Sequence, residues 1–149
     1  IVGTYGYMAP EYAMKGQFSG KSDVYSFGIL LLEIISGQRN TRFRSEEHFG
    51  IIGYAWERWD AGRPMDLVDR SIWDECQHDE ALKCIHLALL CVQNLAEKRP
   101  DMASVMKILE TSNINLPLPS EPNYTLICKQ QDADIPSANN VTMSVIVGR

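Results

Sequence analysis

The sequence predicts a mainly α-helical fold with an extended C-terminal tail, and three observations support this prediction. Residues 22–36 form the most apolar run of the chain. Two later segments, residues 79–92 and 102–109, repeat apolar side chains at the three- and four-residue spacing of a helix. Residues 111–149 lose this periodicity and hold four of the seven prolines. We therefore expect one helical domain over residues 1–110 and a flexible tail after it.

The beginning of the chain indicates an ordered loop that runs into a short helix. Gly3, Gly6 and Gly16 mark irregular backbone. Pro10, followed by Glu11, is typical of the first turn of a helix, where the missing N–H of proline has no intrahelical partner to lose.

The apolar run predicts a central helix that is enclosed by protein. Its apolar residues point in every direction on a helical wheel, whereas a surface helix shows one apolar stripe. We expect Ser22 as the N-cap, Asp23 in the first turn and Gly37 as the left-handed residue that ends the helix. The run is shorter than the ~20 apolar residues that a bilayer span needs. The alternative is a buried pair of strands, and the length of the run argues against it.

After the central helix, the sequence predicts a loop, a helix and a second loop. Residues 38–46 are polar and contain three arginines. A helix over residues 47–61 should carry one aromatic side that packs into the core, formed by Phe49, Ile52, Trp56 and Trp59. Residues 63–75 contain a proline and short apolar pairs, so we expect a loop with one helical turn.

Two more helices complete the predicted domain. The helix over residues 79–92 should pack against the central helix through Ala81, Cys84, Ile85, Ala88 and Val92. Asp101 is the expected N-cap of the last helix. The apolar stripe of that helix would be Met102, Val105, Met106 and Leu109.

Composition argues against several classes of function. The chain has 19 acidic and 14 basic residues and no long basic run, so we expect no nucleic-acid binding. The four cysteines lack paired CxxC spacing, which favours free thiols in a reducing compartment. The three histidines lack the spacing of a metal site. The start at Ile1, without an initiator methionine or signal peptide, suggests a piece of a longer protein.

Three short motifs occur in the order that is found in the C-terminal half of a protein kinase catalytic domain. They are Gly3 to Tyr12 with its Ala-Pro-Glu box, Asp23 to Gly28, and Arg99-Pro100. The chain therefore resembles a protein-kinase C-lobe, the helical subdomain of that domain. A narrower resemblance, to plant receptor-like serine/threonine kinases of the S-domain and cysteine-rich groups, rests on residues 20–40, 84–100, 116–122 and 141–146.

The resemblance implies that residues 3–7 form a substrate-binding loop, which we call the substrate-side loop. In the family, the counterparts of Gly3, Thr4, Gly6 and Tyr7 form the pocket for the residue after the phosphate acceptor. The hydroxyl at the position of Thr4 bridges the catalytic aspartate and a lysine in serine/threonine kinases. A threonine here favours serine or threonine as the acceptor.

The resemblance also implies supporting roles for five residues. Glu11 and Arg99 correspond to the buried ion pair of the family, which ties the substrate-side loop to the helices below it. Asp23 corresponds to the acidic residue that holds the backbone of the catalytic loop. Leu30 and Ile34 match helix positions that support the column of side chains beneath the adenine.

The chain lacks the family's catalytic and ATP-binding residues. Phosphoryl transfer needs a glycine-rich cover, a strand lysine, a base aspartate, a metal-binding asparagine and the Asp-Phe-Gly aspartate. We therefore expect no catalytic residue, metal site or bound cofactor in this chain; ATP and magnesium belong to the full-length family. The expected partners are protein substrates and the N-terminal kinase half. The full-length protein would lie at the cytoplasmic side of the plasma membrane, and this piece would be soluble, without a membrane span.

Two other interpretations stay open. A pseudokinase or non-catalytic C-lobe module would bind partners through Trp56, Trp59 and the loop at residues 38–46. A freestanding helical adaptor would give Gly3 and Thr4 no catalytic loop to contact, which argues against it. The sequence upstream of the chain would separate the first interpretation from an active kinase, because the base aspartate and the strand lysine would be altered in a pseudokinase.

Overall fold

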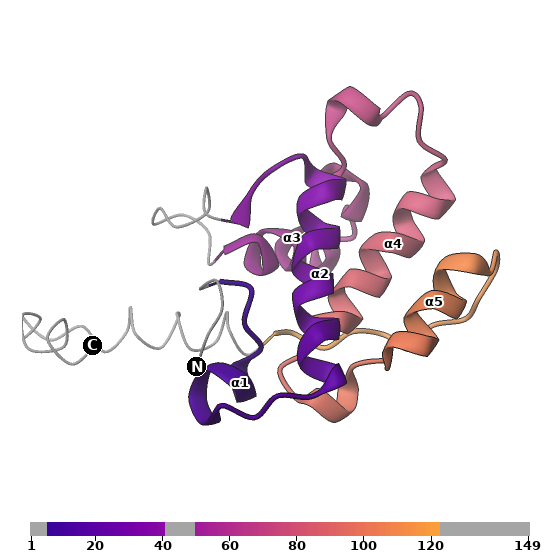
Figure 1. The fold of residues 1–149 in the computed structure, drawn as a ribbon. Coiled ribbons are helices and arrows are strands. Elements are labelled where there is room, and N and C mark those ends of the chain that lie inside the picture. The colour runs from indigo at the N-terminus through magenta and orange to yellow at the C-terminus, as the bar shows by residue number, and fades with distance from the viewer. Residues whose placement is uncertain (1–5, 41–49, 123–149) are drawn as a thin grey trace, which may run out of the picture.

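The computed structural model describes residues 6–40 and 50–122. Within these two ranges the chain is helical and contains no β-strand, which confirms the predicted mainly α-helical class. The elements are α1 (Pro10–Lys15), α2 (Gly20–Ser36), α3 (Gly50–Asp60), α4 (His78–Cys91) and α5 (Met102–Glu110), with 3₁₀ turns η2 (Pro64–Leu67), η3 (Arg70–Ile72) and η4 (Ala96–Lys98). In Figure 1, α2 stands at the centre, with α1 near its lower end and α4 and α5 to its right.

The central helix is present, but it begins earlier than the sequence suggested. Ser19, with extended backbone at φ −154° and ψ 171°, is the N-cap, and the predicted cap Ser22 is the third residue of the helix. The two serines form a capping box, in which the Ser19 N–H donates to Ser22 Oγ at 3.3 Å. The prediction of Ser22 as the cap was therefore wrong, because either serine can cap and the reciprocal pair favours the earlier one. Gly37 ends the helix at φ 66°, as predicted.

One face of α2 is buried and another is exposed, so the expected enclosure on all sides is incorrect within the described residues. Val24, Ile29 and Leu32 are at most 1% exposed, whereas Leu30 is 50% and Ile34 is 71% exposed. The physical reason is that the described helices pack along one side of α2 only. The result is one buried face and one open apolar face on the same helix.

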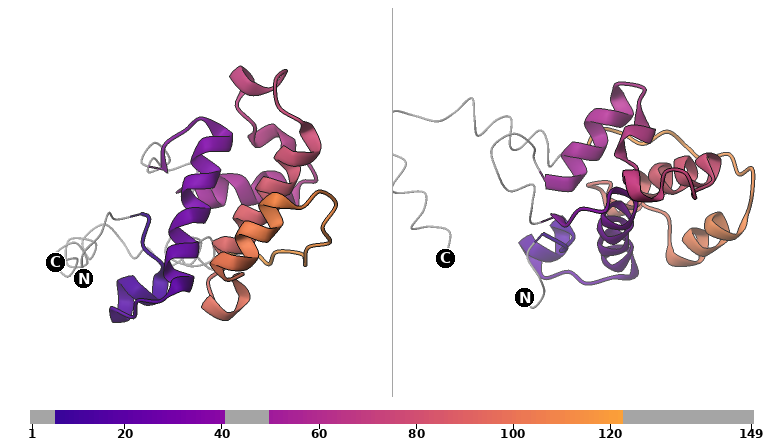
Figure 2. Two further views of the ribbon diagram at one scale, coloured as in Figure 1. Left: turned by 45° about the vertical axis from the view of Figure 1, so that its right-hand side comes forward. Right: turned by 90° about the horizontal axis from the view of Figure 1, so that it is seen from above.

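The buried face of α2 packs against α4, as predicted (Figures 1 and 2). The two backbones come close at Gly28, where a Cβ atom would lie 2.7 Å from Cβ of Cys91 and 2.7 Å from Cγ1 of Val92. Only glycine fits this contact without a shift of the neighbouring helix. The core around it includes Tyr25, Ile29, Leu32, Ile85, Ala88, Leu89 and Val92.

The residues of α3 that are buried in the core are mostly small or aliphatic, and its tryptophans are less buried. Ile51, Ile52 and Ala55 are at most 5% exposed. Trp56 and Trp59 are half-buried and pack at the edge of the core. Phe49, expected on the same side, lies outside the described residues. The following segment forms two 3₁₀ turns, η2 and η3, where one helical turn was expected.

Helix α5 begins at the predicted cap but presents a different stripe. The Asp101 carboxylate accepts a hydrogen bond from the Ser104 N–H at 2.7 Å. Val105 and Ile108 are buried, while Met102 and Met106 are 39% and 51% exposed. The predicted stripe was right for Val105 and Leu109, which pack into a second core cluster, and wrong for the two exposed methionines, and it missed Ile108.

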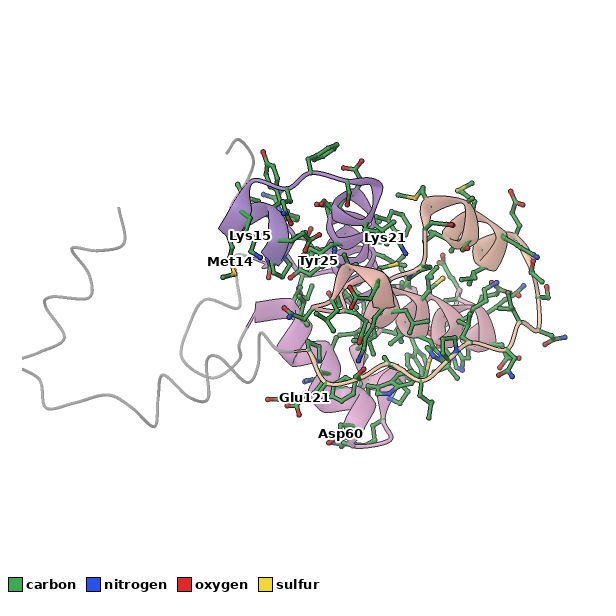
Figure 3. The ribbon with its side chains drawn as sticks, turned by 90° about the horizontal axis from the view of Figure 1, so that it is seen from below. Met14, Lys15, Lys21, Tyr25, Asp60 and Glu121 are labelled. Carbon is green, nitrogen blue, oxygen red and sulfur yellow. The ribbon has the colours of Figure 1, made fainter. Side chains whose placement is uncertain are left out.

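Residues 111–122, the described part of the tail, return across the helices in an extended conformation (Figure 3). A ring nitrogen of His86 lies 2.7 Å from the Pro117 carbonyl oxygen, and the Gln93 side-chain amide donates to the Ser120 carbonyl at 3.0 Å. The side chain of Pro122 is fully buried. This part of the tail therefore lies on α4.

Candidate substrate-side site and its supports

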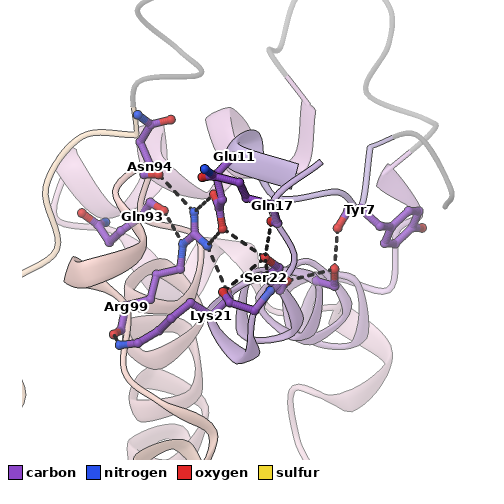
Figure 4. A network of polar contacts seen from close by, with 10 residues as sticks. Tyr7, Glu11, Gln17, Lys21, Ser22, Gln93, Asn94 and Arg99 are labelled. Carbon is purple, nitrogen blue, oxygen red and sulfur yellow. Dashed lines mark hydrogen bonds and ion pairs between the residues drawn. The ribbon is translucent and has the colours of Figure 1, made fainter. Parts of the chain in front are cut away.

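The side chain of Arg99 is fully buried and all five of its N–H groups are hydrogen-bonded. Its Nε donates to the Gln93 carbonyl at 2.7 Å, and its two terminal nitrogens donate to the Lys21 and Asn94 carbonyls at 2.9 and 3.0 Å. The remaining two donors meet the Glu11 carboxylate at 2.7 and 2.8 Å, one to each oxygen (Figure 4). A buried guanidinium is tolerable only when it is paired and saturated in this way.

The structure brings Glu11 to Arg99 because α1 begins at Pro10 and places Glu11 in its first turn. The hydrogen bonds from Arg99 hold the pKa of the Glu11 carboxyl below its ordinary value of 4.5, and partial burial opposes them. The Ser22 hydroxyl donates a further bond to Glu11 at 3.2 Å. The pair therefore joins α1 to the start of α2 and to the segment before α5.

The end of the substrate-side loop is held by α2 at two points. The Ser26 hydroxyl donates to the Tyr7 carbonyl at 2.6 Å (Figure 4), and the Tyr7 hydroxyl donates to Glu33 Oε2 at 2.6 Å. The hydrogen bond to Glu33 raises the pKa of Tyr7, with burial and the negative charge of Glu33 acting in the same direction. Ser26 and Glu33 lie about two turns apart on α2, so both ends of Tyr7 are fixed to one helix.

A second carboxylate contact connects this loop to the segment after α2. The backbone N–H of Asn40 donates to Glu33 Oε2 at 2.8 Å, and its side-chain Nδ2 donates to the Gly6 carbonyl at 2.9 Å. Sequence reasoning did not identify Ser26, Glu33 or Asn40. The one available signal was Glu33, a charged residue inside the most apolar run.

The predicted site residues fall into separate groups. Glu11 and Arg99 form the buried ion pair. Gly6 accepts a hydrogen bond from Asn40, and Tyr7 is hydrogen-bonded to α2. Gly3 and Thr4 lie outside the described residues. Asp23, Leu30 and Ile34 follow one another on a single face of α2, and all three are exposed. We call these three residues the open stripe.

Within residues 6–40 and 50–122, no group of three or more His, Cys, Asp or Glu residues could hold a metal ion. No helix of the same ranges is both long enough and apolar enough to cross a bilayer.

The comparisons with known proteins agree with this geometry. Residues 3–109 match the family model of protein tyrosine and serine/threonine kinases. The chain therefore belongs to the protein kinase family, and the resemblance inferred from the motifs is confirmed.

The curated relatives that the chain matches include receptor-like kinases. It is 52% identical to the G-type lectin S-receptor-like serine/threonine-protein kinase B120 of Arabidopsis thaliana, an alignment that covers 100% of this chain and 19% of that protein. It is 53% identical to the Arabidopsis cysteine-rich receptor-like protein kinase 5, over 83% of this chain and 19% of that protein. The chain thus spans about a fifth of the length of these relatives.

The fold is similar to that of a solved pseudokinase. The pseudokinase domain of BIR2, an immune regulator of the RLK/Pelle family, matches with a TM-score of 0.64 and 25% sequence identity. The match covers 90% of this chain and 38% of that structure. The predicted protein-kinase-like helical fold is therefore confirmed.

Proposed function

We propose that this chain is the substrate-side, helical part of a receptor-like serine/threonine kinase. The intact protein would transfer the γ-phosphoryl group of ATP to serine or threonine residues of proteins. The observation that carries the proposal is the contact of Glu11, from the Ala-Pro-Glu box, with the buried Arg99, 88 residues further along the chain. It supports the assignment because it links two kinase motifs in one saturated ion pair that positions the substrate-side loop.

The open stripe indicates that another polypeptide segment covers this face of α2 in the intact protein. Exposed Leu30 and Ile34 on a central helix are costly, because burying such side chains contributes about 1.5 to 3 kcal/mol each. In the proposal, the N-terminal kinase half covers them and Asp23 binds the backbone of its catalytic loop. Leu30 and Ile34 would then support the side chains beneath the adenine.

Within the substrate-side loop, Gly3, Thr4, Gly6 and Tyr7 would bind the residue after the acceptor. Thr4 would bridge the catalytic aspartate and a lysine, which favours serine or threonine substrates. The family's glycine-rich cover and Asp-Phe-Gly aspartate, which bind ATP and magnesium, do not occur in this sequence, so the proposal assigns that binding to polypeptide outside this chain. The intact protein would act at the cytoplasmic side of the plasma membrane.

Thr4→Ala in the intact protein tests the proposal. Transfer of labelled phosphate from ATP to a serine/threonine peptide should fall about 100-fold, the usual cost of a small misplacement of the reacting groups. The unfolding midpoint should stay unchanged, since Thr4 would act on the reaction and not on the core. Equal activity of the variant and the wild type would contradict the proposed role of Thr4 in the site.

A non-catalytic function is the second candidate, and the similarity to the BIR2 pseudokinase domain favours it. In that case the half-buried Trp56 and Trp59 and the loop at residues 38–46 would contact a partner protein. An intact protein that transfers no phosphate, and whose upstream sequence has lost the strand lysine or the base aspartate, would support this candidate and contradict the first.

A further inference from the structure

Asn40 occupies a junction between three segments that are distant in the sequence. It follows the end of α2 and precedes α3, and the Gly6 carbonyl lies within reach of its side chain. No motif of the family resemblance assigns a role to this residue.

The amide of Asn40 is used as both donor and acceptor. Its Nδ2 donates to the Gly6 carbonyl at 2.9 Å, and its Oδ1 accepts from the Ile51 N–H, in the first turn of α3, at 3.2 Å. An aspartate would serve the second contact at least as well, because a negative charge is favoured at a helix N-terminus. An ionised aspartate could not also donate to the loop carbonyl, whereas the amide can.

Position 6 requires glycine for this contact. Its backbone φ of 95° is one that residues with a side chain rarely adopt, and a Cβ atom there would lie 2.8 Å from Asn40 Nδ2. The contact therefore uses the side-chain amide of Asn40 and the absence of a side chain at Gly6.

We propose that Asn40 is a positioning residue that fixes the substrate-side loop to the start of α3. It acts through Gly6 and, by its backbone N–H, through the Glu33 carboxylate that also accepts the Tyr7 hydroxyl. Its role in catalysis rests on the proposed kinase function, because a fixed loop presents a formed pocket to the protein substrate. The loop contact itself does not depend on that function.

Two substitutions in the intact protein separate the two contacts. Asn40→Asp keeps the acceptor for α3 but replaces the donor to the Gly6 carbonyl by a carboxylate oxygen, so the hydrogen bond to the loop is lost, and the new charge lies near Glu33. Asn40→Ala loses both contacts. Asn115→Asp makes the same chemical change at an exposed tail residue and serves as the control.

Amide hydrogen exchange reads the loop directly. With Asn40→Asp, the segment that contains Gly6 and Tyr7 should exchange about five- to ten-fold faster, the effect of one lost hydrogen bond, while Ile51 stays protected. With Asn40→Ala, both segments should exchange faster. Unchanged exchange at Gly6 and Tyr7 in both variants, or a change at α3 alone, would overturn the proposal.

Steady-state kinetics test the consequence for the substrate. Asn40→Asp should raise the KM for a serine/threonine peptide about five- to ten-fold and leave the KM for ATP unchanged, because only peptide binding uses the loop. A parallel rise of both constants would indicate general loosening and contradict a positioning role. If the wild type transfers no phosphate, the kinase function fails, and the exchange experiment alone decides the role of Asn40.

Discussion

Near each end of α2 a glutamate carboxylate links distant segments of the chain, but the groups that it binds differ in burial. At the N-terminal end, Glu11 meets Arg99, whose side chain is fully buried. At the C-terminal end, Glu33 accepts bonds from the Tyr7 hydroxyl and the Asn40 N–H in a half-buried position. Both carboxylates are partly exposed to water, but the Arg99 guanidinium is not, so water cannot replace a partner that Arg99 loses. The first end should therefore determine the stability of the domain, and the second should determine the geometry of the loop.

The largest effect should come from breaking the buried pair. Glu11→Ala or Arg99→Ala should lower the free energy of unfolding by roughly 3 to 5 kcal/mol, because either change leaves a charge without its partner. Glu33→Ala is the matched control at the other end of α2, and should cost about 1 kcal/mol. Urea unfolding at pH 7 measures all three variants. Equal losses for the Glu11 and Glu33 variants would contradict the difference between the two ends.

Between the ends, the close contact of α2 with α4 should give the next largest effect. Gly28→Ala places a methyl group 2.7 Å from Cys91 and Val92 side-chain atoms, so it should lower stability by about 1 to 3 kcal/mol through overpacking. Gly20→Ala adds the same methyl at the start of α2, where no atom lies within 4 Å. That control should be neutral or stabilising by up to ~1 kcal/mol. Thermal unfolding of both variants would show whether the helix contact is as tight as the structure indicates.

The two ends should also respond to opposite ends of the pH scale. The folded pKa of Glu11 is lowered by Arg99, so its contribution is present above pH 4.5 and is lost as the pH falls through the folded pKa. The folded pKa of Tyr7 is raised above 10.0, so the unfolded state loses its proton first and stability falls as the pH rises beyond that value. Glu11→Gln should flatten the acid limb of the stability curve, and Tyr7→Phe the alkaline limb. A variant that leaves its own limb unchanged would refute the assignment for that end.

Sequence reasoning could predict the elements of this fold and one of its two carboxylate contacts. Periodicity located α2, α4 and α5 because each has an apolar face of several turns, and the motif order gave Glu11 with Arg99. It missed Asn40 because a single polar residue in a loop carries no periodic signal, and its three contacts come from segments that only the fold brings together. It also predicted an enclosed α2, since a helical wheel shows which residues are apolar but not which are covered by the same chain.

The smallest effect should come from the open stripe, and it distinguishes this chain from the intact protein. Ile34 is 71% exposed, so Ile34→Gln should change the stability of the present chain by less than about 0.5 kcal/mol. If the N-terminal kinase half covers the stripe, the same variant should cost about 2 kcal/mol in the intact protein, because a polar amide would then be buried without a partner. Urea unfolding of both forms measures the difference. Equal, small effects in both forms would mean that the stripe stays open, and would argue against Leu30 and Ile34 as supports beneath a bound nucleotide.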